Sequence, residues 1–466
     1  MYINLLQRIL KKIEPDINQR KKIYQIAKNY VEKTRNFCLE IHEVCDVVLA
    51  GSVEKDTMLK NNVDIDILVL FREDVDKIRF KELGLEIGKK VFDENGYIER
   101  YVSHPYLEKN IDDIVVSIIP GYKVIPPEWK SAVDRTYYHI EYVKTKLSKK
   151  QNSEVRLLKS FLKNIKIYGA ETHINGFSGY LSELLIIKYG TFLNTLKIVS
   201  NWRIQTIIDI ENLWNGNVNL IKNMFLDSPL IVIDPVDKNR NVASSVNMKT
   251  LAKFISVCRA FLNKPSEKFF ISKLKNQDID IDKIFDDDRK FILLYIKHDF
   301  VIRNTLYPKI KKLSKKIENK FKSNSFKVIK TGIYLNIEKS YIFFELEQLN
   351  LSRNYMHIGP TVFEREHETQ FIKKNFNLAS SIWITADGKW ATIKKRTILN
   401  AYSILTSIIE DDPIFQKQFK TFMIKTSKIF EMRQILKLVK KDIDLHNFFI
   451  DFALGEELWL AYMKTK

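Results

Sequence analysis

Apolar residues near the amino terminus recur with the spacing of an α-helix. Within residues 2–43 they stand three or four positions apart, first at Leu5, Ile9 and Ile13 and again from Ile23 onward. This spacing puts the apolar side chains on one helical face. Pro15 interrupts the pattern, so we expect two helices with a break between them.

The pattern then changes to short apolar runs that are typical of strands. We expect strands at 46–50, at the apolar run that ends at Phe71, at 98–103 and at 114–119. A helical pattern over 75–94 lies among them and is closed by the turn pair Asn95-Gly96. Together these elements predict a mixed sheet flanked by helices, with polar residues at the strand ends.

Beyond residue 140 the pattern divides the chain further. The polar stretch 144–152 is predicted to be a first hinge, and Pro265 with Ser266 a second boundary. Between them we expect helices over 153–196 and a short strand at 230–233 that opens into a loop, DPVDKNRNV. After the second boundary we expect a charged loop (273–287), strands at 291–296, 341–346 and 390–397, a lysine-rich helix at 309–322, and mostly helix over 400–466.

The composition indicates the number of domains and the class of binding partner. The 466 residues are 45% hydrophobic and 29% charged, which predicts a globular protein of two to four domains. The net charge of +19 favours a polyanionic partner, either nucleic acid or an anionic membrane surface, although lysines spread along the chain also serve solubility. The three cysteines lack metal-binding spacing and no apolar run reaches the length of a membrane span, so we expect a cytoplasmic protein.

The stretch Gly51–Phe71, GSVEKDTMLKNNVDIDILVLF, carries the strongest chemical signal. Asp64 and Asp66 lie on one face of the predicted strand, with their Cα atoms about 6–7 Å apart. Two carboxylates beside a Gly-Ser turn, whose N–H groups can bind phosphate, indicate a site for a metal ion and a nucleotide. The alternative is a solvated strand end that carries two acids by chance.

Several segments resemble the archaeal-type (class I) CCA-adding enzymes, which are tRNA nucleotidyltransferases of the polymerase-β-like superfamily. In chain order they are GSVEKDTMLKNNVDIDILVLF (51–71), HPY (104–106), PGYKV (120–124), SAVDRTYYH (131–139), EVRLLKSFLKNIKIYGAE (154–171), GFSGYLSELLI (176–186) and DPVDKNRNVA (234–243). Past residue 300 the resemblance is thinner and rests mainly on IGPTVFERE at 358–366.

The resemblance implies an α+β, multidomain fold. A polymerase-β-like nucleotidyltransferase head (1–148) would precede a helical neck or central nucleotide-selecting domain (149–265) and a mixed α/β, RNA-binding body with an α/β tail (266–466). It also implies addition of C, C and A to the tRNA 3′ end from CTP and ATP, without a nucleic-acid template and with two Mg²⁺ ions. The implied partner is the tRNA acceptor end and not a membrane, and a homodimer is left open.

The resemblance also assigns residues to the nucleotide. Asp64 and Asp66 match metal-binding carboxylates, and Gly51 and Ser52 match the triphosphate turn. Lys55 stands where the family often has arginine. The remaining matches to residues that contact triphosphate, ribose or base are His104, Arg135, Thr136, His139, Lys159, Tyr168 and Arg240.

Ordinary structural roles are open for some of these residues. The two histidines, His104 and His139, could be packed in the interior, Arg135 with Thr136 could begin a helix, and Tyr168 could belong to the core. Arg240 is expected to face the incoming base, where its fork of donors can meet cytosine or adenine. It could also pair with Asp234 or Asp237, and the two roles are compatible.

One catalytic position departs from the family. The pattern D-x-x-P-x-Y-K supplies the third carboxylate, and here that position is Ser117. Asp113 lies four residues earlier, about 13 Å along a strand, and is too far to replace it. A neutral hydroxyl is a weaker ligand, so we expect nucleotide and tRNA binding to be intact, the metal that activates the primer to be weak or absent, and transfer to be slowed by roughly 10²–10⁴.

Three functions follow from these observations. The first is CCA addition with impaired turnover, and the second is a tRNA-binding paralogue without catalysis. The third is another RNA-terminal nucleotidyltransferase, which the two long central motifs disfavour. The sequence is consistent with Ser117 as a natural change and as an introduced substitution.

Overall fold

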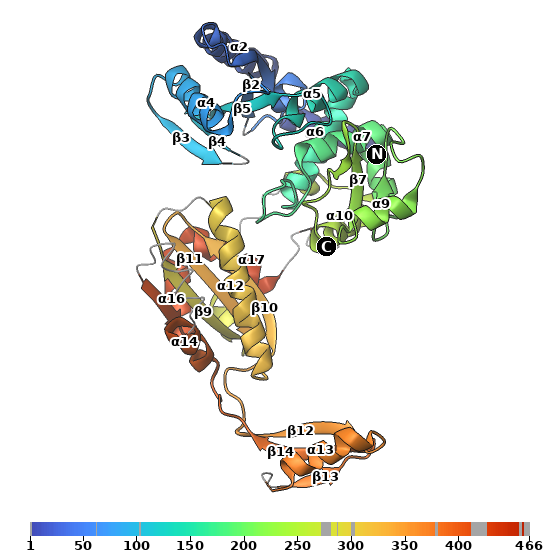
Figure 1. The fold of residues 1–466 in the computed structure, drawn as a ribbon, viewed down its shortest axis with the longest axis vertical. Coiled ribbons are helices and arrows are strands. Elements are labelled where there is room, and N and C mark those ends of the chain that lie inside the picture. The colour runs from blue at the N-terminus through green and yellow to red at the C-terminus, as the bar shows by residue number, and fades with distance from the viewer. Residues whose placement is uncertain are drawn as a thin grey trace. The chain divides into compact units, whose positions relative to one another are not determined.

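The computed structural model describes residues 2–61, 63–101, 104–271, 281–286, 288–299, 303–377, 381–411, 426–455 and 459–460. The chain forms two compact units, the first made of residues 1–274 with 457–466 and the second of residues 275–456. Figure 1 labels their elements. No helix among the described residues is long and apolar enough to cross a membrane.

The amino-terminal pattern forms the two expected helices, α1 (Tyr2–Ile13) and α2 (Ile17–Cys38). Pro15 lies between them as predicted. Asp16 then caps α2: its side chain accepts from the backbone N–H of Gln19, whose side chain accepts in return from the N–H of Asp16. This capping box supplies partners to backbone groups that the start of a helix leaves unpaired.

The predicted mixed sheet is present, with strand order β1-β2-β5-β4-β3. Only the β2–β5 pair is parallel. Its elements are β1 (Val44–Ala50), α3 (Gly51–Glu54), β2 (Val63–Arg72), α4 (Lys77–Val91), β3 (Tyr97–Tyr101), β4 (Pro105–Ile111) and β5 (Ile114–Lys123). β5 runs four residues past the predicted end at 119, since its pairing with β2 continues to Lys123.

The two faces of this sheet are buried differently, and the difference positions the site. Side chains such as Ile65 and Ile67 belong to a core that also contains residues of α2 and α4. On the other face Leu68 and Leu70 pack against Ile140 of α5 (Arg135–Lys146). Asp64 and Asp66 share this second face because strand side chains alternate. They lie beyond the part of it that is packed against Ile140.

The central helices of the first unit pack around a large apolar core. They are α6 (Lys149–Asn164), α7 (Gly179–Tyr189), α8 (Phe192–Val199) and α10 (Met248–Asn263), followed by the short helix η1 (Glu267–Phe269). Helix α9 (Val218–Met224) packs instead in a smaller cluster through Ile221. The predicted hinge at 144–152 is wrong, because α5 and α6 are separated only by Leu147 and Ser148. Leu147 is buried against the central core, and Ser148 begins the α6 capping box.

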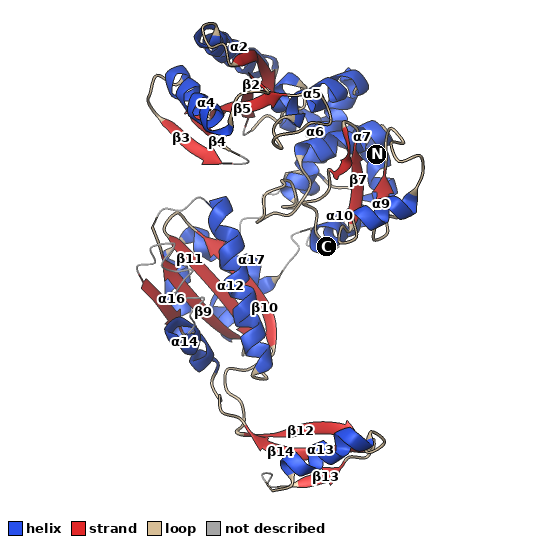
Figure 2. Ribbon diagram, in the orientation of Figure 1, coloured by secondary structure: helices blue, strands red, loops and turns tan. Residues whose placement is uncertain are grey.

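A small sheet joins these helices (Figure 2), with strand order β6-β7-β8. β6 (Thr206–Ile208) pairs in parallel with β7 (Leu230–Asp234), which pairs with β8 (Asp237–Asn241). The strand at 230–233 is therefore confirmed. The predicted loop DPVDKNRNV is instead a tight hairpin, because its residues pair back onto the strand before it.

The second unit contains an antiparallel sheet of order β10-β11-β9-β15. Its strands are β9 (Lys290–Lys297), β10 (Val328–Leu335), β11 (Lys339–Leu346) and β15 (Thr426–Phe430). Alternate side chains enter two cores. One also contains residues of α12 (Arg303–Ser323) and α14 (Ala401–Asp411), and the other contains residues of α11 (Ile281–Asp286), α16 (Met432–Lys441) and α17 (Ile443–Leu454).

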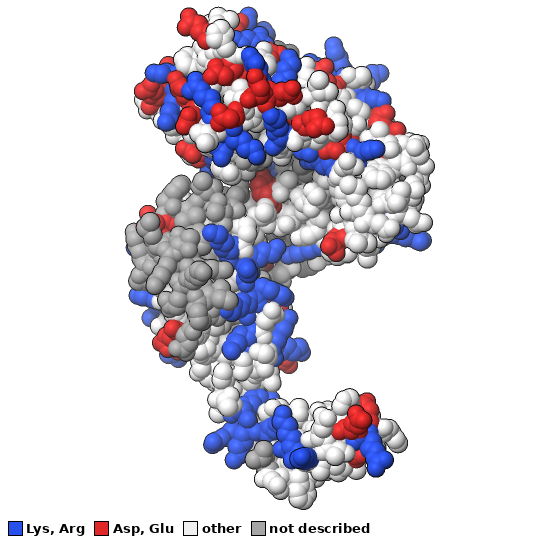
Figure 3. All heavy atoms as spheres, in the orientation of Figure 1, with Lys and Arg blue, Asp and Glu red and all other residues white. Residues whose placement is uncertain are grey.

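The lysine-rich helix α12 is amphipathic. Its buried face includes Leu313, Ile317 and Phe321. Its exposed face carries Lys311, Lys312, Lys315, Lys320 and Lys322. Figure 3 shows lysine and arginine side chains gathered over this helix.

One prediction in this region needs correction. Residues 281–286 are helical and not a loop, because their apolar side chains Ile281 and Ile284 enter a core; residues 272–280 lie outside the described residues. The described carboxyl-terminal part is mostly helical, as predicted, and also contains strand β15. A smaller sheet, of order β12-β14-β13, is formed by β12 (Asn354–Thr361), β14 (Lys389–Lys395) and β13 (Ile382–Ile384), with α13 (Arg365–Asn375) packed on it.

Candidate functional site

The two aspartates lie together with the Gly-Ser turn, as the sequence predicts. Gly51 begins α3 directly after β1 and has φ +68°. A Cβ added to Gly51 would stand 2.0 Å from Oδ2 of Asp66, so only glycine lets the turn approach this carboxylate. Ser52 follows in the same turn, and its carbonyl accepts from the N–H of Thr57 at 2.9 Å. The turn and the carboxylate therefore form one surface.

Desolvation and nearby negative charges raise the pKa of both carboxylates, although the Asp64 residue itself is exposed. Desolvation, together with the charges of Asp64 and Glu108, raises the pKa of Asp66 to about 6, against an opposing effect of Lys55. Desolvation and Glu108 also raise the pKa of Asp64. Neither aspartate side chain has a hydrogen-bond partner among the described residues. Carboxylates destabilised in this way, without partners, are suited to bind a cation.

Ser117 lies in β5 directly opposite Asp66 in the neighbouring strand β2. Its side chain is on the same face as the aspartates, and the residue is only 3% exposed. A carboxylate at this position would stand beside Asp66, as the resemblance requires of a third acid. The hydroxyl that occupies the position is neutral.

A buried glutamate that the sequence analysis missed holds two lysines, Lys159 and Lys55, the second of which acts on the pKa of Asp66. Glu183 of α7 accepts from Lys55 Nζ at 2.6 Å and from Lys159 Nζ of α6 at 2.9 Å. Thr57 donates to the same carboxylate at 2.7 Å. Burial alone would raise the pKa of Glu183, but the two ammonium groups outweigh it and hold the pKa well below its usual range. The result is a rigid pair of cations beside the Gly51 turn.

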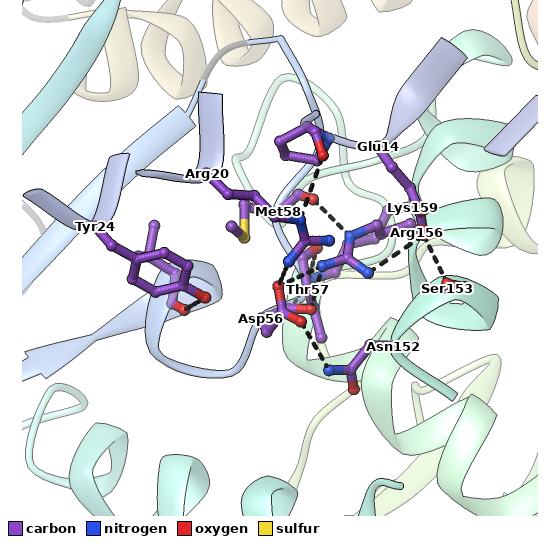
Figure 4. Close-up of polar contacts among 12 residues, drawn as sticks. Glu14, Arg20, Tyr24, Asp56, Thr57, Met58, Asn152, Ser153, Arg156 and Lys159 are labelled. Atoms are coloured by element: carbon purple, nitrogen blue, oxygen red, sulfur yellow. Dashed lines mark hydrogen bonds and ion pairs between the residues drawn. The ribbon is translucent and has the colours of Figure 1, made fainter. Parts of the chain in front are cut away.

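A second polar network fixes the segment between α3 and β2 (Figure 4). Arg156 of α6 is 1% exposed and donates to the carbonyls of Met58 (2.9 Å) and Asp56 (2.6 Å) and to the Asp56 carboxylate (2.6 Å). Arg20 of α2 pairs with the same carboxylate, and Asn152 donates to it at 3.4 Å. Arg156 and Asp56 are a hundred residues apart, so only the tertiary structure reveals the contact.

The expected base-facing residue, Arg240, lies on β8 in a third network. Its guanidinium donates to Asp234 at 2.6 Å. The same buried carboxylate accepts from Tyr180 at 3.1 Å and contacts His139 Nε2 at 2.9 Å. The His139 ring also stacks on Tyr180 with centroids 3.9 Å apart. The predicted pairing of Arg240 with Asp234 is confirmed, and it leaves part of the guanidinium accessible, because the side chain is 34% exposed.

The remaining predicted residues fall at the edges of these networks. Arg135 starts α5 and donates to Asp237 at 2.8 Å, and Thr136, the next residue of the helix, is half-buried. Tyr168 is half-buried, and its hydroxyl lies beside Gly179, as does the Lys159 ammonium group. Arg135 and Thr136 thus begin a helix, and Arg135 also reaches the β7–β8 hairpin.

His104 is the predicted site residue that the structure does not bring to this group. Its Nε2 lies 2.6 Å from the carbonyl oxygen of Pro120, and its ring packs edge-on against Phe80 of α4. Phe80 belongs to the core on the face opposite the aspartates. Burial lowers the pKa of His104 and keeps it neutral. The packed-histidine alternative is the one that the structure shows.

Asp64 and Asp66 fit a divalent cation in ligand type, since hard cations prefer carboxylate oxygens. No group of three or more His, Cys, Asp or Glu side chains close enough to share an ion occurs in the described part of the chain. The predicted metal site therefore rests on the aspartate pair alone.

Comparison with known protein families gives three matches along the chain. A nucleotidyltransferase domain matches residues 31–143, the second domain of tRNA nucleotidyltransferase matches 153–271, and the C-terminal domain of CCA-adding enzyme matches 289–431.

Individual relatives extend over most of the chain. A CCA-adding enzyme of Methanocaldococcus jannaschii is 35% identical over 79% of this chain and 83% of its own length. One from Archaeoglobus fulgidus is 36% identical over 75% and 78%, and one from Sulfolobus acidocaldarius is 30% identical over 95% and 97%. Among solved structures, CdnC of Escherichia coli MS115-1 with ATP has a TM-score of 0.44, 16% identity, and coverage of 58% and 95%. A cytoplasmic RNA terminal U-transferase has a TM-score of 0.45, 12% identity, and coverage of 58% and 98%.

Proposed function

This chain belongs to the family of CCA-adding enzymes, and on that premise we propose that it adds or repairs the 3′-terminal CCA of tRNA from CTP and ATP without a nucleic-acid template. One observation carries the proposal: the Gly51 turn, the aspartate pair and the buried lysine pair meet at one site in a chain that matches such enzymes over most of its length. The family is one of nucleotidyltransferases, which use a divalent metal ion and nucleoside triphosphates.

We assign Mg²⁺ to Asp64 and Asp66. When bound there, the metal neutralises charge on the triphosphate and favours ionisation of the attacking 3′-hydroxyl. The protein has to present both aspartates as carboxylates. Because the pKa of Asp66 is raised to about 6, Asp66 is mostly ionised at neutral pH and loses its charge as the pH falls through 6.

The lysines serve the phosphates in this proposal. Lys55 and Lys159 are held by Glu183 within hydrogen-bond distance, so their positions are set before a nucleotide arrives. The Gly51–Ser52 turn adds backbone N–H groups to the same surface. Arg135, Thr136, His139 and Tyr168 complete the nucleotide site.

Base selection is assigned to Arg240. Its guanidinium is oriented by the buried Asp234 and remains partly exposed, so part of the fork of donors is available to a base edge. Asp234 and Tyr180 hold it in place and are positioning residues.

Ser117 slows transfer in this account. A hydroxyl is a weaker metal ligand than a carboxylate and cannot act as a base at neutral pH. The direct test is incubation with tRNA lacking CCA, CTP, ATP and Mg²⁺. We expect slow addition of CCA by the natural sequence and, for Ser117→Asp, a rate roughly 10²–10⁴-fold higher. Absence of product from both proteins would refute the proposal.

Ser117 also favours one alternative, a tRNA-binding paralogue without catalysis. That function requires salt-sensitive tRNA binding and no activity in Ser117→Asp. Product length distinguishes another RNA-terminal nucleotidyltransferase, because such an enzyme would not stop after three additions on a generic RNA primer.

The proposal has consequences for partners and organisation. The tRNA acceptor end is the macromolecular substrate, and the basic face of α12 is the surface we assign to RNA phosphates. We retain the division into a head (1–148), a nucleotide-selecting domain (149–265) and an RNA-binding body and tail (266–466). A cytoplasmic location stays a prediction, which cell fractionation checks, and the oligomeric state is left to sedimentation analysis.

A further inference from the structure

Three neighbouring strands place polar side chains in one row across the sheet. Asp66 on β2 pairs with Ser117 on β5, and Ser117 pairs with Glu108 on β4. Directly paired residues of neighbouring strands project from the same face. Glu108 is therefore one strand further from Asp66 than the serine that replaces the family carboxylate.

The serine in the middle of the row has no hydrogen-bond partner among the described residues, although Ser117 is only 3% exposed. Its oxygen is not among the buried side-chain atoms that lack a partner, so the hydroxyl is open to solvent and can meet a ligand. Beside two aspartates that also lack partners, the hydroxyl indicates room for a polar group between Asp66 and Glu108.

Glu108 can reach this space. Neighbouring strands are about 4.8 Å apart, and glutamate extends one methylene further than aspartate, by about 1.5 Å. Its charge is already felt at both aspartates, whose pKa values it raises. Asp113 is four residues from Ser117 along β5 and has no such access.

In the structure the Glu108 carboxylate already has two hydrogen-bond partners, one on the edge strand β3 and one on its own strand β4. Its carboxylate accepts from Arg100 Nε of β3 at 2.7 Å and from the Tyr106 hydroxyl at 3.0 Å. The Arg100 side chain is 45% exposed and that of Glu108 is 21% exposed. An ion pair so open to water is weak and can be exchanged for a stronger partner.

We propose that Glu108 supplies the third carboxylate of the metal site, leaving Arg100 and turning over Ser117 toward Asp66 when a divalent cation binds. This inference rests on the proposed function, because it takes Asp64 and Asp66 as the cation site. Glu108 then compensates in part for the acid that Ser117 lacks, and it does so from a different strand.

The test compares four proteins: the natural sequence, Glu108→Gln, Ser117→Asp and the double variant. Mn²⁺ binding with CTP present is measured by electron paramagnetic resonance, and CMP transfer to tRNA lacking CCA by single-turnover kinetics. In the natural background we expect Glu108→Gln to weaken Mn²⁺ binding and to slow transfer, each at least tenfold. In the Ser117→Asp background, where an aspartate holds the position, the same change should alter both by less than threefold.

A purely structural role for Glu108 makes a different prediction. If Glu108 only paired with Arg100, its loss would have the same effect in both backgrounds, and Arg100→Gln would reproduce it. We expect Arg100→Gln to leave Mn²⁺ binding unchanged or tighter, since it releases Glu108. Equal effects in both backgrounds, or unchanged Mn²⁺ binding in Glu108→Gln, would overturn the inference.

Failure of the inference can be told from failure of the proposed function. If the natural protein extends tRNA but Glu108→Gln has no effect, Glu108 is not a ligand and the function stands. If only Ser117→Asp extends tRNA, Glu108 does not compensate and the inference also falls, while the site assignment stands. If neither extends tRNA, the proposed function itself is refuted.

Discussion

At the scale of single residues, the negative charge of Asp66 serves the proposed function but destabilises the folded state. Its pKa is raised to about 6, above the usual value of an aspartate in an unfolded chain. The folded state therefore binds more protons than the unfolded state between pH 4 and 6, so the destabilising effect of the charge is fully present above pH 6 and disappears as the pH falls toward 4.

We accordingly expect Asp66→Asn to stabilise the first unit at pH 7.5, by about 2–4 °C in melting temperature, while abolishing nucleotide transfer. Calorimetry at pH 7.5 and 4 checks this. The gain in melting temperature should vanish at pH 4. Asp64 is exposed, so Asp64→Asn should give a smaller gain at pH 7.5. A melting temperature lowered by Asp66→Asn at pH 7.5 would contradict the account of this charge.

Arg240 gives a second residue-scale prediction. Arg240→Lys keeps a cation beside Asp234 but removes the planar fork, so discrimination between the correct and incorrect nucleotide should fall by about 1–3 kcal/mol, roughly 5- to 150-fold. Single-nucleotide incorporation with CTP or ATP on tRNA ending before each position measures it. Arg259→Lys on α10, where the arginine donates to the carbonyl of Ser200, is the matched control and should leave selection unchanged.

At the scale of elements, the turn between β1 and α3 depends on the absence of a side chain at Gly51. Gly51→Ala would put a Cβ at 2.0 Å from the Asp66 carboxylate and force alanine into a left-handed conformation. We expect a loss of about 1–3 kcal/mol in the free energy of unfolding together with weakened Mn²⁺ binding.

Gly190→Ala separates these two effects. Gly190 has φ +85°, but nothing lies within 4 Å of its added Cβ. Its substitution should destabilise the protein without changing Mn²⁺ binding, as chemical denaturation and Mn²⁺ titration of both variants will show. Identical Mn²⁺ affinity in Gly51→Ala and the natural protein would argue against the contact between turn and carboxylate.

Elements were predicted well where local pattern decides them. Helical spacing around Pro15 and the alternation around Asp64 and Asp66 are properties of neighbouring residues, and the helices and strand are present as expected. The register between strands is a property of distant residues. Glu108 stands opposite Ser117 only because β4 pairs with β5, and no spacing within either segment reveals it.

The same reason explains the other errors at this scale. The polar stretch 144–152 lacks a local signal for the packing of Leu147 in the central core, so it was predicted to be a hinge. His104 matches a family motif, but the contact that places it is with Pro120 and Phe80. Glu183 and Arg156 were missed because each contacts partners about a hundred residues away.

At the scale of the whole molecule, charge is the feature that composition predicts directly. The net charge of +19 and the exposed lysines of α12 favour binding to RNA phosphates. If six to ten phosphates are contacted, affinity for tRNA should fall by about 10³–10⁵ between 50 and 200 mM salt. Filter binding over this range measures how steeply the affinity for tRNA falls with salt concentration. A combined change of Lys311, Lys312 and Lys315 to glutamine should make this salt dependence shallower. An unchanged slope would remove α12 from the RNA surface.

The central claim is that this chain completes tRNA ends by itself despite Ser117. The most direct measurement is the length and sequence of the product formed on tRNA lacking CCA, with CTP, ATP and Mg²⁺, by the natural protein and by Ser117→Asp. We expect both to stop after C, C and A, with the variant faster. A product that grows beyond three nucleotides, or no extension by the natural protein, would contradict the claim.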